Sequence, residues 1–208
     1  MTTEGLRARK KRETRRRISD IATMLFAQRG FDNVTIAEVA EAADVAKKTV
    51  TNYFSRKEDL LLDRHEDRLI ELDALIRGRP AHESIAAVLR RHQHELLAAK
   101  HPLSGVVDRI QPFLKIMTDS PALMNRAREM NREIEQVLTG ALVSEGAEPL
   151  EARLVGVQLA SAMSAIWDIG VTRSQDWADT DLVRREQVGV IDAAFDLVER
   201  GIGDYGTR

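Results

Sequence analysis

The chain has 208 residues, of which 43% are hydrophobic and 31% charged, a balance typical of one or two compact cores. It contains no cysteine, which excludes disulfides, thiolate metal sites and cysteine nucleophiles. The N-terminus has no apolar stretch resembling a secretory signal, so we expect a cytoplasmic protein. Aromatic residues are scarce at 4% and there are only five prolines, which favours helices over strands.

The net charge of −2 conceals an uneven distribution of charge along the chain. Residues 1–60 carry 13 Lys and Arg against 9 Asp and Glu, whereas residues 61–208 carry 18 against 24. The basic excess is densest in RARKKRETRRR, residues 7–17. A basic first segment on an acidic remainder suggests that only the first segment meets a polyanion, although a solvated arm has the same composition.

One stretch, residues 154–171, is apolar enough to test as a membrane span, and its length is at the lower limit for one. Four of its side chains would be costly in lipid, namely Gln158, Ser161, Ser164 and Asp168. We therefore predict a helix buried in protein and no membrane partner.

Helix signals are clearest in the first third of the chain. Apolar residues recur at intervals of three and four at Ile18, Ile21, Ala22, Leu25 and Phe26, and Gly30 then closes this predicted helix. Thr35 and Glu38 form a capping box that starts a second helix. Asp44 stands at the expected tight turn, and a third short helix follows over residues 47–53.

Beyond residue 54 the periodicity stays helical. Ser55 and Glu58 form a second capping box, which predicts a long helix over residues 55–76. Further helices are predicted over residues 81–100, 121–145, 150–171 and 181–200, with prolines interrupting the middle of the chain. About nine helices and no convincing strand predict an all-α fold.

The stretch TIAEVAEAADVAKKTVTNYFSRKEDLL, residues 35–61, carries the most specific pattern. Its apolar residues pack two helices across a tight turn and leave Lys47, Lys48, Thr51 and Asn52 outside. Lysine and asparagine can hydrogen-bond base edges, and threonine can contact a thymine methyl group. Because turn, cap and exposed polar face occur together, we predict a helix-turn-helix DNA-binding motif over about residues 34–53 rather than a merely solvated helix face.

Residues 15–62 resemble the DNA-binding domain of the TetR family of bacterial regulators. The shared features are the apolar stripe, the RGF turn, the TxxEVA helix and the TVxNYFxxKEDL end. The resemblance covers about a quarter of the chain. It implies a DNA-binding domain with a basic arm over residues 1–56, and a helical effector-binding and dimerisation domain over residues 57–208.

The resemblance also implies which residues contact DNA. The implied phosphate contacts are Thr35, Lys47, Tyr53 and Lys57, and the implied base contacts are Lys48, Thr49, Thr51 and Asn52. The basic arm before Ile18 is a candidate for further minor-groove or backbone contacts. Asp44 and Ala46 replace a usual glycine and a usual capping residue, and Lys48 and Thr51 also depart from the common pattern. These last two change the groove-facing surface, so no operator sequence carries over.

A single recognition helix covers too little DNA for tight specificity, so we expect a homodimer on an inverted-repeat operator. The predicted interface consists of two stripes on the last two helices, Gly156, Ala160 and Ser164 on one and Val183, Gln187, Val190, Ile191, Ala194 and Val198 on the other. The same stripes are compatible with an intramolecular core.

The resemblance places an effector pocket among the helices between the fourth helix and this interface. Candidate pocket residues are Leu89, His92, Leu96, Phe113, Met117, Met124, Arg128, Met130, Met163 and Trp167, all equally compatible with a plain core. His92 and His94 point away from each other on a helix, so we predict no metal site, and nothing indicates a cofactor.

The favoured interpretation is a TetR-like transcriptional regulator, a repressor released from a palindromic operator when a small-molecule effector shifts the fourth helix. An activator or an effector-independent DNA-binding factor is the alternative. A helical enzyme that retains the DNA-binding segment is disfavoured, because the sequence has no convincing nucleophile–base pair, phosphate-binding glycine loop or metal-ligand cluster.

Overall fold

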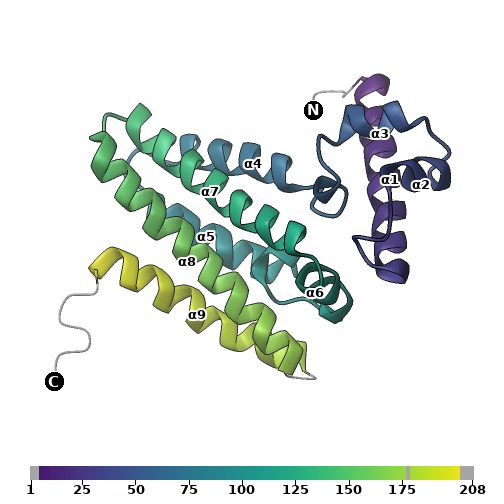
Figure 1. The fold of residues 1–208 in the computed structure, drawn as a ribbon. Helices are drawn as coiled ribbons and strands as arrows, with labels where there is room; N and C mark the ends of the chain where they lie inside the picture. Colours follow the sequence, from purple (N-terminus) through teal and green to yellow (C-terminus); the bar gives the residue numbers. More distant parts are fainter. Residues whose placement is uncertain (1–4, 177–178, 202–208) are drawn as a thin grey trace. The chain divides into compact units, whose positions relative to one another are not determined.

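We describe the protein from a computed structural model, which describes residues 5–176 and 179–201. These residues form nine α-helices and two short 3-10 helices and contain no strand (Figure 1), which confirms the all-α prediction. The chain divides into two compact units. Unit 1 comprises Met1–Glu66 and Pro112–Ala127, and unit 2 comprises Asp67–Gln111 and Arg128–Arg208. The boundary expected after residue 56 does not anticipate the return of residues 112–127 to unit 1.

Unit 1 is built on four α-helices and a 3-10 turn. These are α1 (Leu6–Arg29), α2 (Ile36–Ala42), α3 (Lys47–Tyr53), η1 (Glu58–Leu60) and α6 (Gln111–Thr118), together with the first turns of α7 (Pro121–Ser144). Their apolar faces meet in one core that contains Phe26, Val39, Val50, Leu60 and Leu123, all buried. The short α2 and α3 are therefore held by packing against α1 rather than by their own helical stability.

Unit 2 is a helical bundle formed by α4 (His65–Arg77), α5 (Ile85–Ala98), η2 (Pro102–Ser104), the remainder of α7, α8 (Pro149–Asp176) and α9 (Thr180–Arg200). Helices α8 and α9 lie side by side (Figure 1), and α9 also packs on α5. The core includes Leu72 of α4, Leu89 of α5, Leu138 of α7, Ile166 of α8 and Phe195 of α9.

The helix predicted over residues 55–76 begins ten residues later, at His65. The expected capping box at Ser55 does not form, because the Ser55 hydroxyl donates to the carboxylate of Asp59 at 3.1 Å. Residues Glu58–Leu60 form a 3-10 turn instead, and Arg126 donates to the same Asp59 carboxylate at 3.0 Å. A local capping signal is thus overridden by a tertiary ion pair within unit 1.

Helix α8 is the one described helix that is long and apolar enough to cross a membrane by length and composition. One face of it is buried in unit 2, with Leu159, Met163 and Ile166 in the core. Its opposite side exposes Leu154 and Val157. An apolar helix with one face packed in a protein core and one face open is a common element of soluble bundles.

Candidate nucleic-acid interface

The turn that orients the recognition helix forms as expected. The Thr35 hydroxyl accepts from the Glu38 backbone N–H at 3.2 Å, and the Glu38 carboxylate accepts from the Thr35 N–H at 2.8 Å. Hydrogen bonding to the Arg29 guanidinium and to Thr35 lowers the pKa of Glu38 to about 2. Asp44 adopts a left-handed conformation with φ of 50°, where a short polar residue is tolerated. The capping box fixes the start of α2, and the turn fixes the direction of α3.

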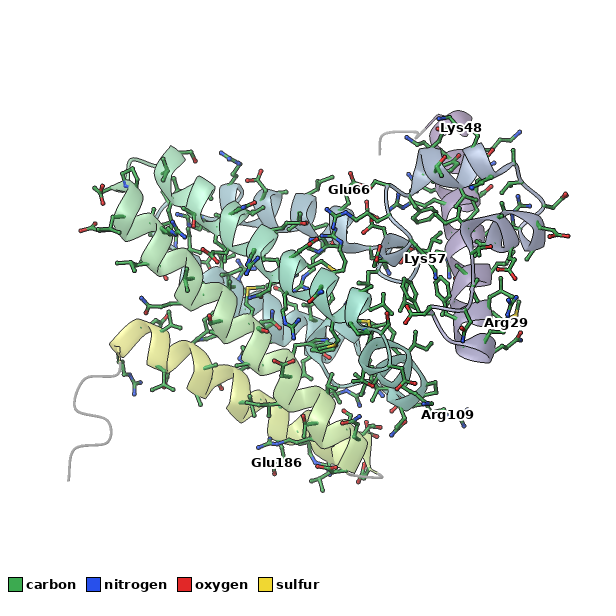
Figure 2. All side chains as sticks on the ribbon, viewed as in Figure 1. Arg29, Lys48, Lys57, Glu66, Arg109 and Glu186 are labelled. Carbon is green, nitrogen blue, oxygen red and sulfur yellow. The ribbon has the colours of Figure 1, made fainter. Side chains whose placement is uncertain are left out.

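Helix α3 presents a polar outer face on a buried anchor. Val50 is almost completely buried, whereas Lys47, Lys48, Thr51 and Asn52 are exposed (Figure 2 labels Lys48). Two lysines without any shielding carboxylate in their own helix give this face a positive charge. The side chains expected to contact DNA bases and phosphates therefore lie together on one exposed helix face, which has the dimensions and chemistry that a major groove accepts.

Two further residues predicted to contact DNA, Thr49 and Tyr53, are half-buried and therefore less accessible than the exposed residues of α3.

The start of α3 has no side-chain cap. Ala46 stands at the capping position and its side chain makes no hydrogen bond there, as its substitution for a capping residue predicts. The first N–H groups of α3 therefore have no side-chain cap from Ala46.

The sequence analysis missed Arg15 as a residue that shapes this site. Its guanidinium donates to the Tyr53 carbonyl at 2.6 Å and to the Asp63 carbonyl at 2.9 Å, and it lies 4.6 Å from the centre of the Phe54 ring. Arg15 therefore satisfies a carbonyl at the end of α3. Charge composition places Arg15 in the basic arm, but it lies three residues before Ile18 on the inner face of α1. That spacing is the signal that could have identified it.

The basic arm is not a separate extended segment. Helix α1 begins at Leu6, so residues 9–17 are the first turns of a helix, and most of their basic side chains are exposed. The side chain of Arg7 lies outside the described residues. The positive charges of these residues therefore lie along a helix rather than along an extended, flexible segment.

Lys57 makes contacts within unit 1 that the sequence does not predict, and its phosphate contact stays a prediction. Its ammonium group donates to the Phe31 carbonyl at 2.5 Å and lies 4.2 Å from the centre of the Phe31 ring (Figure 2 labels Lys57). Burial lowers the pKa of Lys57. The lysine therefore braces the loop between α1 and α2 from inside unit 1, a tertiary role that its sequence context does not reveal.

We predict that Lys57→Ala lowers the stability of the protein and leaves the number of DNA phosphates that it contacts unchanged. Loss of the carbonyl hydrogen bond and the cation–π contact should reduce the free energy of unfolding by about 1–2 kcal/mol. The slope of log affinity against log salt should match the wild type in DNA-binding titrations. Lys47→Ala is the matched comparison, and it should reduce that slope by about 0.9. A reduced slope in Lys57→Ala would restore the phosphate-contact assignment.

The residues predicted at the dimer interface lie mainly inside unit 2. Ala160, Val183, Gln187 and Ile191 are buried within the single chain, and Val190, Ala194 and Val198 pack against the same core. Gly156 does permit a close helix approach, but to Thr139 and Glu135 of α7. Ser164, Val190, Ala194 and Val198 are partly exposed. The buried members of the two stripes thus pack within one chain, and a role of the partly exposed members in a dimer stays a prediction.

The predicted pocket residues do not gather in one unit. Phe113 and Met117 of α6 and Met124 of α7 belong to unit 1, and the other seven candidates belong to unit 2. Within unit 2, Leu89 and Met163 are buried core residues. His92 and Leu96 are half-buried on α5. In the described part of the chain no group of three or more His, Asp or Glu side chains is arranged to hold a metal ion.

Comparison with known proteins agrees with this geometry. The sequence model described as "Bacterial regulatory proteins, tetR family" matches residues 18–63. The fatty acid metabolism regulator protein of Bacillus subtilis is 24% identical over 93% of this chain and 98% of that relative. The HTH-type transcriptional regulator TcmR of Streptomyces glaucescens is 25% identical over 86% of this chain and 80% of that relative.

Among solved structures, NalD of Pseudomonas aeruginosa, the secondary repressor of the MexAB-OprM multidrug efflux pump, superposes with a TM-score of 0.54. The similarity covers 88% of this chain and 97% of NalD at 14% identity, and it shows that the two proteins share a fold.

The all-α fold and the exposed polar face of α3 are those of a helix-turn-helix DNA-binding regulator. The match to the tetR family lies in residues 18–63, the segment that contains α2, α3 and the turn between them.

Proposed function

We propose that the protein is a homodimeric repressor that a small-molecule effector releases from an inverted-repeat operator in the cytoplasm. The observation that carries the proposal is the exposed set Lys47, Lys48, Thr51 and Asn52 on a recognition helix anchored by buried Val50. The repressor assignment is supported by the description of NalD as a repressor. Two recognition helices related by a two-fold axis would contact two half-sites, which supplies the specificity that one helix lacks.

The dimer is proposed to form through the exposed sides of α8 and α9. After the core residues are set aside, these helices still expose apolar side chains, among them Leu154 at 55% and Leu197 at 49% of their full area. The exposed residues Val157 and Gly189 belong to the same two adjacent helices. Exposed apolar groups on two neighbouring helices of a soluble chain are typical of a surface that a second subunit covers.

We expect Leu154→Glu to convert the dimer to monomer at micromolar concentration. A buried carboxylate facing its own copy across a two-fold axis should raise the dissociation constant of the dimer by about 100-fold or more. Ile70→Glu on α4 is the matched control, because Ile70 is equally apolar and is 65% exposed. Sedimentation equilibrium measures both variants. A Leu154→Glu protein that dimerises like the wild type would place the interface elsewhere.

Helices α4 and α7 each contain residues of both units, and we propose that effector binding in unit 2 changes DNA binding through them. Helix α7 begins in unit 1 and continues past Ala127 into unit 2, and α4 begins at His65 in unit 1 and continues into unit 2. The start of α7 is fastened within unit 1, because Arg126 bonds Asp59 and Ser120 donates to Asp32 at 3.1 Å. A ligand that favours one arrangement of these helices in unit 2 would shift the population of DNA-competent dimers.

The proposal is tested by selecting fragments of genomic DNA bound by the purified protein and measuring affinity for the recovered sequence. We expect an inverted repeat bound by a dimer, with loss of binding when a cognate small molecule is added. Recovery of direct or single half-sites would contradict the symmetric dimer. Increased occupancy of the promoter by RNA polymerase when the protein is bound would identify an activator instead.

A further inference from the structure

We propose that unit 2 binds an apolar monocarboxylate whose carboxylate group is held by the guanidinium of Arg68 on α4. The inference rests on the proposed function, because it names the chemical class of the effector. It depends on a charged side chain on the inner side of α4 that has no ion-pair partner among the described residues.

Arg68 lies on the inner side of α4. It precedes Leu72 and Ile76 by four and eight residues, and both of these are buried in the core of unit 2. Side chains at these intervals share one helix face. Arg68 itself is half-buried, so part of its side chain remains in contact with solvent. The group is therefore sheltered by protein but accessible to a ligand.

The other half-buried arginines in the described residues have electrostatic partners, in contrast to Arg68. Five of them form ion pairs with carboxylates, namely Arg15, Arg79, Arg90, Arg126 and Arg184. A sixth, Arg173, lies in the last turn of α8, where the helix dipole favours a cation. Arg68 has neither kind of partner among the described residues. Burial lowers its pKa, and no neighbouring carboxylate acts in the opposite direction.

A guanidinium cannot lose its proton at neutral pH, so a sheltered and unpaired one raises the free energy of the unliganded protein. An anion bound there would recover that energy. The planar fork of a guanidinium fits both oxygens of a carboxylate, and the two charge-assisted hydrogen bonds strengthen in a site with little water. Because a bound acid removes this free-energy penalty, the unpaired state of Arg68 in the free protein increases the affinity for an acid.

The neighbourhood of Arg68 favours one negative charge over two. Arg68 lies close enough to His92 of α5 for its charge to lower the pKa of that imidazole, to which burial contributes most. Glu95 and Glu71 act on the same imidazole in the opposite direction, and His101 acts with Arg68. A phosphate dianion would meet the repulsion of both glutamates, whereas a monocarboxylate carries half that charge. Neutral His92 retains one N–H that can donate to the bound acid.

The apolar part of the ligand follows from the rest of the α4 face. Leu69 is partly buried against the core beside Arg68, and the same face continues through Leu72. A molecule with its carboxylate on Arg68 would lay its remaining atoms against aliphatic side chains. An acid without an apolar body would lose this contact, since buried apolar area supplies most of the binding free energy of such ligands.

The test compares acids with their uncharged esters on the full-length protein. Decanoate and naphthoate are each paired with their methyl esters, and decyl phosphate serves as the dianionic probe. Thermal unfolding and titration calorimetry report binding. We expect at least one acid to stabilise the wild type more than its ester does, and decyl phosphate to bind more weakly than decanoate. Arg68→Met should weaken binding of that acid about 10- to 100-fold and leave ester binding unchanged.

Arg77→Met is the matched control on the same helix, because Arg77 is exposed and pairs with Asp73; it should bind the acid like the wild type. Without ligand, Arg68→Met should unfold at the same temperature as the wild type or higher, whereas a merely structural arginine would give a destabilised variant. The proposal is wrong if neither acid exceeds its ester, or if Arg68→Met binds the acid normally. Operator binding by the same samples is measured in parallel, so a neutral effector would overturn Arg68 as an anion site and leave the regulator function standing.

Discussion

The double variant Lys48→Ala, Asn52→Ala should bind the selected operator about 30- to 20,000-fold more weakly than the wild type. Each side chain is exposed on α3, and a good base contact contributes roughly 1–3 kcal/mol of discrimination, so two lost contacts remove about 2–6 kcal/mol. Binding to unrelated DNA should change much less, because the phosphate contacts outside these two positions persist. Fluorescence anisotropy with operator and scrambled duplexes at fixed salt measures both quantities.

The control for this variant is Lys115→Ala, Gln136→Ala, which removes one lysine and one amide side chain from exposed positions on α6 and α7. It should bind the operator normally. Equal unfolding temperatures for the two double variants would show that α3 remains folded. Wild-type operator affinity in Lys48→Ala, Asn52→Ala would mean that the exposed face of α3 does not contact the bases.

Gly105→Ala should destabilise the protein by about 3 kcal/mol or more and lower its unfolding temperature by roughly 6–12 °C. Gly105 follows η2 with φ of 80°, a left-handed conformation that costs other residues about 1–2 kcal/mol. A Cβ at this position would also lie 2.5 Å from the Trp167 carbonyl oxygen and 2.9 Å from its Cα. Both of those atoms belong to the backbone of α8, so a side-chain rotation cannot relieve the overlap.

The close approach at Gly105 supports several bonds that the alanine would disturb. The Gln187 amide donates to the Ile166 carbonyl at 2.6 Å, and the Trp167 indole donates to the Pro102 carbonyl at 3.3 Å. Gly140→Ala is the matched control, because Gly140 lies in α7 with nothing within 4 Å of an added Cβ. That variant should gain about 0.5–1 kcal/mol. Differential scanning calorimetry compares the two, and equal stabilities would refute the packing at η2.

Local signals in the sequence predicted the DNA-binding unit well. The structure contains the predicted capping box at Thr35 and the turn at Asp44, and α3 starts without a side-chain cap as expected. Each of these features involves residues within about four positions of one another. The exposed face of α3 follows from periodicity around Val50. Interactions of this range are encoded in the spacing of residue types, and they need no knowledge of the remaining chain.

Partners that are distant in sequence had no such signal. The Arg15 guanidinium donates to the carbonyl of Tyr53, and the Lys57 ammonium group donates to that of Phe31. Charge composition placed Arg15 in a basic arm, and the family resemblance implied a phosphate contact for Lys57. At Ser55 a capping pattern gave way to the ion pair between Asp59 and Arg126. Each outcome depends on which chain segments pack together, and no pattern within a few residues specifies that.

For α8 and α9, too, the sequence predicted the helices but not their packing partners. Their apolar and small residues were identified from the sequence, but the sequence did not say which face meets the chain's own core. Helix α8 is apolar on more than one side, so its periodicity cannot separate the face around Gly156, which packs on α7, from the face around Leu154, which stays exposed. The sequence by itself determined the helices, the recognition turn and its exposed polar face. Only the tertiary structure decided which apolar faces pack within one chain, and that Arg68 has no ion-pair partner among the residues that the structure describes, because burial is set by the neighbours that the whole fold supplies.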